Sequence, residues 1–98
     1  MITFKIKPEY IDLWGDEATT ETELTLDDIE MIARGWDKTA ADVIDNLIPV
    51  NYDSAVELMD DDIREAVHSD LAPCTEAAFL LEYMKRHEQK YGTPFAVA

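Results

Sequence analysis

The sequence predicts a single α+β domain, with about four helices and a small sheet. Three observations support this: an alternating apolar segment at the N-terminus, four segments with helical apolar spacing, and a hydrophobic content of 47% in 98 residues. A net charge of −14 alone would be typical of disorder, but disordered chains are poor in aromatic residues, whereas two Trp, four Tyr and three Phe occur here. We therefore expect residues 1–98 to form one compact acidic domain.

The two ends of the chain are predicted to form the sheet. Apolar and polar residues alternate over residues 2–7, which is the period of a half-buried strand. The apolar segment 95–98 predicts a final strand beside the first. Residues 10–14 form an apolar group typical of a turn or short helix. The polar stretch 16–23 could be a loop or, with Thr22 and Leu24, a short edge strand.

Two helices are predicted in the first half of the chain, over residues 26–34 and 39–48. Thr25 is a good N-cap for the first helix and Gly35 a natural stop, while the second begins at its own threonine cap. Together they outline a helical hairpin of the helix-turn-helix kind. Its second helix carries Asp42 and Asp45 where a DNA reader needs Lys or Arg, so DNA reading is not expected.

Two longer helices are predicted in the second half, over residues 53–69 and 75–91. The first has apolar residues at helical spacing and ends before Pro73. Thr75 caps the second, and Gly92 ends it.

The strongest local pattern is a row of acidic residues spaced four apart on the predicted helix 53–69. On one helix face such side chains lie about 6 Å apart, which is comparable to the spacing of phosphates along a nucleic-acid strand. The row can therefore present carboxylates to a protein as a phosphate backbone would; the alternative is a solvated face that aids solubility. The candidate residues are Asp53, Glu57, Asp60, Asp61 and Glu65.

A second acidic group precedes and opens the predicted helix 26–34. Few basic residues interrupt either group: between Pro8 and Met84 lie 21 of the 22 acidic residues, with three Lys or Arg. Such single-sign fields are unusual on a surface that serves only solubility. The pattern favours core positions for Trp14, Trp36, Tyr52 and Tyr83; if one of them is exposed beside the acids, we expect it to be Trp36, in the turn of the hairpin. The candidates from this group are Asp27, Asp28 and Glu30.

Several function classes are excluded or disfavoured. The sequence has no phosphate-binding glycine loop and no serine-centred elbow, so no enzyme and no cofactor is expected. The spacing of His68, Cys74 and His87 matches no zinc pattern, so no metal is expected either. A negative surface is repelled by free nucleic acid and by anionic lipid. The lone cysteine and the absence of a signal peptide or membrane span favour the cytoplasm.

In size, charge and the acidic stretches 21–30 and 53–65, the chain resembles a class of small acidic inhibitors from phages and mobile elements. This class includes anti-CRISPR and anti-restriction proteins. The resemblance implies a non-enzymatic inhibitor in a bacterial cytoplasm, which binds the positive nucleic-acid surface of a defence nuclease by phosphate mimicry. The alternative is a helical adaptor or antitoxin-like module that uses an apolar groove. The segment 95–97, if exposed at a sheet edge, could also pair with a second copy.

Overall fold

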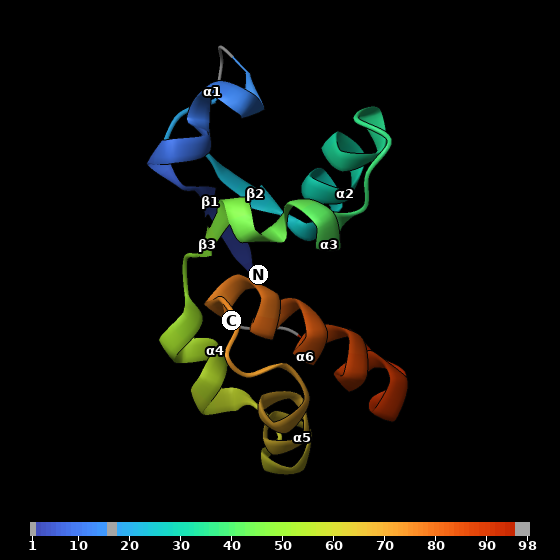
Figure 1. Ribbon diagram of the computed structural model, residues 1–98. Coiled ribbons are helices and arrows are strands. Elements are labelled where there is room, and N and C mark those ends of the chain that lie inside the picture. Colours follow the sequence, from blue (N-terminus) through green and yellow to red (C-terminus); the bar gives the residue numbers. More distant parts are fainter. Residues whose placement is uncertain (1, 16–17, 96–98) are drawn as a thin grey trace.

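The computed structural model describes residues 2–15 and 18–95. Its sheet has three antiparallel strands in the order β2 (Glu23–Thr25), β1 (Thr3–Ile6), β3 (Leu47–Pro49). In Figure 1 the strands lie between an upper group of helices from the first half of the chain and a lower group from the second half. The helical segments are η1 (Pro8–Tyr10), α1 (Ile11–Trp14), α2 (Leu26–Gly35), α3 (Ala40–Val43), η2 (Ile44–Asn46), α4 (Tyr52–Leu58), α5 (Asp61–Leu71) and α6 (Glu76–Tyr91).

Strand β1 is the central strand of the sheet, and its prediction is confirmed. Its side chains alternate between half-buried and buried, and Phe4 is completely buried. Of the two alternatives for the polar stretch, a loop or an edge strand, the strand is present as β2. The predicted partner at 95–98 is not the strand beside β1, because β2 and β3 occupy its two edges. Residues 96–98 lie outside the described part of the chain, and Phe95 is buried but not in a strand.

The predicted helix 39–48 is wrong in its second half. Helix α3 makes about one turn, η2 follows, and the chain then enters β3. In β3 Leu47 and Pro49 are buried and Ile48 is exposed, which is the alternation of a strand. Pro49 is tolerated because β3 is an edge strand. Pairing with β1, which is distant in sequence, therefore overrides the local helical pattern.

Local capping explains where α2 and α3 begin, as the sequence predicted. The Thr25 hydroxyl accepts from the backbone N–H of Asp28 at 3.2 Å, and the Asp28 carboxylate accepts from the N–H of Thr25 at 3.0 Å. The same reciprocal capping box joins Thr39 and Asp42. Both helices are therefore fixed at their first turn by residues three apart.

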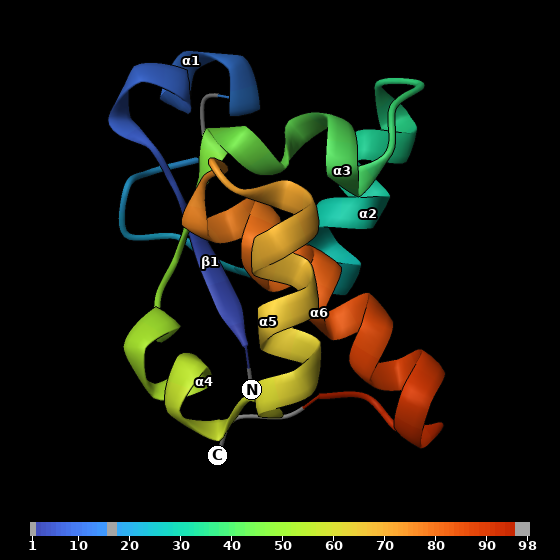
Figure 2. The same ribbon diagram turned by 60° about the horizontal axis from the view of Figure 1, so that its bottom comes forward.

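The predicted helix 53–69 is in fact two helices. Helix α4 ends at Leu58, and α5 begins at Asp61 after an extended residue pair. Asp60 caps α5, since its Oδ1 accepts from the N–H of Asp62 at 2.9 Å and of Ile63 at 3.2 Å. Figure 2 shows α4 turned away from α5 at this break. The cap and the buried Met59 stop α4 from continuing.

The longest helix, α6, is confirmed over the predicted range. The Thr75 hydroxyl accepts from the N–H of Ala78, and Gly92 ends the helix in the left-handed region at φ 72°. Its buried residues Leu80 and Tyr83 face the core, and α5 packs along it (Figure 2). Within residues 2–15 and 18–95, no helix is both long and apolar enough to cross a bilayer.

Candidate interaction surface

The predicted row of carboxylates is not continuous, because its members lie on two helices. Asp53 and Glu57 are on α4, and Asp61 and Glu65 are on α5, on the other side of the break at Asp60. The regular four-residue spacing therefore does not correspond to one helix face. The side chains of these four residues are nevertheless exposed.

Asp60 is the least available of the predicted acids, since its carboxylate is used inside the molecule. Besides capping α5, its Oδ2 accepts from Lys90 Nζ at 3.3 Å and from the Tyr91 hydroxyl. Its backbone N–H donates to the Tyr83 hydroxyl at 2.7 Å. The hydrogen bond from Tyr91, with that from Ile63, lowers the pKa of Asp60 to about 2. Asp60 thus joins the start of α5 to the end of α6.

Other ion pairs also lie on the α5–α6 side of the molecule. Arg64 donates to Asp61 at 2.9 Å within α5. Arg86 on α6 reaches Asp70 on α5 at 2.7 Å and Glu82 on its own helix at 3.1 Å. Basic residues are therefore interleaved with acids on this side. Ion pairs connect both the start and the end of α5 to α6.

The predicted acids of α2 have a different environment. Asp27 and Glu30 are exposed and form no ion pair among the described residues, while Asp28 is exposed but completes the capping box. Arg34 and Lys38, the basic residues of this region, also form no ion pair there. The acids of α2 consequently remain available to a partner.

Trp36 is less exposed than a free interface anchor would be. Its ring meets that of Trp14 edge to face, with centroids 5.1 Å apart, and it is half-buried against the core. The turn after α2 places it there, because the N–H of Trp36 donates to Ala33 O. Only part of the indole could contact a partner.

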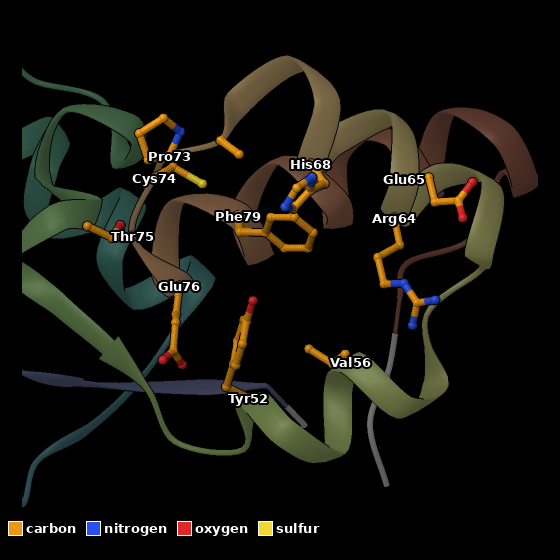
Figure 3. Close-up of a pocket in the computed structure, with 11 residues that line it drawn as sticks. Tyr52, Val56, Arg64, Glu65, His68, Pro73, Cys74, Thr75, Glu76 and Phe79 are labelled. Atoms are coloured by element: carbon orange, nitrogen blue, oxygen red, sulfur yellow. The ribbon is translucent and has the colours of Figure 1, made fainter.

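A groove that the sequence analysis missed lies between α4, α5 and the start of α6. Its volume is about 760 Å³, within the range of small-molecule sites. Figure 3 shows the Tyr52 hydroxyl pointing into it, opposite the Phe79 ring. The apolar part of the wall comes from Tyr52, Val56, Ala72, Pro73 and Phe79. No local pattern could have revealed it, because three helices and a loop contribute.

The groove has a polar rim that includes one predicted acid. Glu65 lies on α5, Glu76 on α6, and Arg64 and His68 complete the α5 side (Figure 3). Burial raises the pKa of Tyr52, and the negative charge of Glu76 raises it further. A phenol with such a pKa stays neutral and can donate a hydrogen bond at physiological pH.

The three residues considered for zinc are not brought together as one site. His68 and Cys74 both line the groove. His87 instead packs against Tyr83, Tyr91 and Phe95, with ring centroids 4.7–5.8 Å apart. Across the described residues, no group of three or more His, Cys, Asp or Glu could hold a metal ion.

Comparison with protein families supports the anti-CRISPR class. Residues 48–95, which run from β3 through α6, match a family model described as Anti-CRISPR protein AcrIC5. The class-level resemblance to anti-CRISPR proteins is therefore confirmed. The match covers just under half of the chain and includes the groove, but not α2 or α3. No curated protein and no solved structure matches significantly.

Proposed function

We propose that this protein is a non-enzymatic inhibitor of a CRISPR–Cas effector complex and acts in the cytoplasm of a bacterial cell. The match of residues 48–95 to the family of Anti-CRISPR protein AcrIC5 carries this proposal. The match concerns the α4–α6 unit. The partner is accordingly a protein complex, rather than free nucleic acid or a membrane.

The proposed mechanism is occupation of a positively charged nucleic-acid surface by exposed carboxylates. Among the described residues, only five carboxylates take part in ion pairs. The other acids of the described residues are exposed to solvent, and their negative field speeds encounter with a basic surface by roughly 10- to 10³-fold at low salt. Arg and Lys side chains that normally meet phosphates would then meet carboxylates.

The exposed acids without an ion pair are the best members of the predicted set. These are Asp27, Asp28 and Glu30 on α2, Asp53 and Glu57 on α4, and Glu65 on α5. Asp60 and Asp61 would have to give up intramolecular contacts with Lys90 and Arg64. Trp36 contributes its exposed edge at the end of α2.

The test compares two variants with the same change in net charge. The first carries Asp53→Asn, Glu57→Gln and Glu65→Gln; the control carries Glu9→Gln, Asp12→Asn and Glu88→Gln, three exposed acids outside the proposed surface. Each is titrated by surface plasmon resonance onto purified CRISPR–Cas effector complexes of several subtypes. We expect the first variant to lose at least tenfold in affinity, as for several charge pairs worth about 0.5 kcal/mol each, and the control to bind almost normally. Equal loss in both would mean that only total charge matters.

Competition and salt dependence test the mimicry itself. Added target DNA should displace the protein from the effector, and raising the salt concentration should weaken binding because exposed charges are screened within about 8 Å at physiological ionic strength. Simultaneous binding of DNA and inhibitor would contradict phosphate mimicry while leaving inhibition possible by another route. The alternative of an adaptor that uses an apolar groove has support of its own, because a groove of about 760 Å³ exists.

A further inference from the structure

We infer that the groove between α4, α5 and the start of α6 receives an apolar side chain, aromatic or aliphatic, from a basic segment of the target protein. This inference rests on the proposed function and deepens it, since it adds an anchor to a surface otherwise described by charge. The occupant has two required properties: a side chain that fills the apolar wall, and Lys or Arg residues on either side of it.

The apolar requirement follows from the wall of the groove. Phe79 is 8% exposed, and Tyr52 and Val56 are half-buried against the core, so the hydrophobic core supports the wall. The volume of about 760 Å³ exceeds what one aromatic side chain fills, and leaves room for the backbone that carries it. An anchor that is buried in a well-packed pocket usually contributes most of the binding energy of an interface. The hydroxyl of Tyr52, which points into the groove in Figure 3, can donate to a carbonyl of the bound segment.

The basic requirement follows from the rim. Glu65 and Glu76 stand on opposite sides of the groove, one on α5 and one on α6 (Figure 3). Arg64, the basic residue of the rim, is already paired with Asp61 at 2.9 Å. Asp53, beside Tyr52 at the start of α4, is exposed as well. A segment with Lys or Arg on both sides of its anchor complements these carboxylates, whereas an acidic segment or a phosphate backbone is repelled.

The position of the groove connects it to the family match. All residues that line it fall between Tyr52 and Glu76 or at Phe79, inside the matched range 48–95. Glu65 lines the groove, and Asp53 and Glu57 each follow a lining residue of α4 in the sequence, Tyr52 and Val56 respectively. One target surface could therefore engage the carboxylates and the groove together.

The direct test uses two synthetic peptides, Arg-Arg-Phe-Arg-Arg and Arg-Arg-Ala-Arg-Arg, titrated into the isotope-labelled protein and followed by NMR. We expect the first peptide to shift the signals of Tyr52, Val56 and Phe79. It should bind with an affinity at least about tenfold higher than that of the second peptide, which lacks the apolar anchor. Equal affinities, or shifts confined to residues outside the groove, would overturn the inference.

Cys74 supplies a second readout, because it is the single cysteine of the chain, is exposed and lines the groove. The Phe peptide should slow alkylation of the Cys74 thiol by iodoacetamide severalfold, and the Ala peptide should not. Protection by a single-stranded oligonucleotide, or protection that grows with the concentration of the protein alone, would assign the groove to nucleic acid or to a second copy. Either result would refute a basic peptide as the occupant.

The variant Cys74→Trp fills the groove, and Leu13→Trp is its control, since Leu13 is 61% exposed on α1 and far from this wall in sequence. Both should keep the wild-type circular dichroism spectrum. We expect Cys74→Trp to bind the effector complex at least tenfold more weakly and Leu13→Trp to bind normally. If Cys74→Trp binds like wild type while the acidic triple variant does not, the groove inference fails and phosphate mimicry stands. If no effector complex binds the wild-type protein, the proposed function fails, and the peptide titration still decides what the groove accepts.

Discussion

The acids of α2 and α3 and the acids of α5 are used by the fold in different ways. In the first region Asp28 and Asp42 cap their own helices through residues three apart, and no ion pair forms with Arg34 or Lys38 among the described residues. In the second, Asp60 reaches Lys90, 30 residues away. The aspartates of the first region fix local structure only, whereas Asp60 both caps α5 and joins it to the distant helix α6. Net charge alone does not reveal this difference.

The largest effect we expect tests whether the two regions fold as one unit. Leu80→Ala on α6 removes a side chain that is 1% exposed, and should lower the free energy of unfolding by about 2–5 kcal/mol. Leu58→Ala, at a position 58% exposed, is the control and should have little effect. Thermal unfolding followed by far-UV and near-UV circular dichroism should remain a single transition for Leu80→Ala. Two separated transitions would show that α2–α3 and α5–α6 are independent.

A smaller effect distinguishes a local cap from a cap with a distant contact. Thr25→Ala should destabilise by about 1 kcal/mol, through loss of the α2 capping box. Thr75→Ala should cost more, because Thr75 also donates to the Asp45 carboxylate at 2.9 Å, which connects α6 to η2. Urea unfolding of both variants measures the difference. A larger loss at Thr25 would reverse the comparison.

The contacts of the Asp60 carboxylate with Lys90 and Tyr91 should also affect the pH dependence of stability. The pKa of Asp60 is about 2 in the folded protein, below its ordinary value of 3.8, because hydrogen bonds from Tyr91 and from the N–H of Ile63 stabilise the carboxylate. This contribution is fully present above about pH 4 and is lost as the pH falls toward 2. Asp60→Asn keeps a capping oxygen but loses the charge. The difference in free energy of unfolding between this variant and wild type, measured in urea, should therefore become smaller from pH 5 to pH 2. A constant difference would contradict a stabilising role of the Asp60 charge.

The smallest effect is expected for the exposed acids of α2. Asp27→Asn and Glu30→Gln together should change the free energy of unfolding by less than about 0.5 kcal/mol, because both side chains are exposed and their removal also lowers the repulsion between like charges. Urea titration at low salt measures the change. A loss above about 1 kcal/mol would mean that these acids have a structural contact, and would weaken their assignment to a partner.

Much of the helical structure could be predicted because it depends on near neighbours. Thr25, Thr39 and Thr75 mark true helix starts, and Gly92 marks a true end. Asp60 also carried a local signal, since an aspartate before two further acidic residues is a common helix start. That signal was masked by the regular apolar spacing across the break, and one helix was predicted in place of α4 and α5.

The sequence by itself determined the acidity, the α+β class, the first strand and most helix starts, because composition, alternation and capping act over a few residues. Only the tertiary structure decided that Leu47–Pro49 pairs with β1, that Asp60 holds Lys90, and that Tyr52 and Phe79 face each other across a groove. Each of these contacts joins residues that are far apart along the chain. Their stability depends on packing between distant segments, so no local pattern reports them.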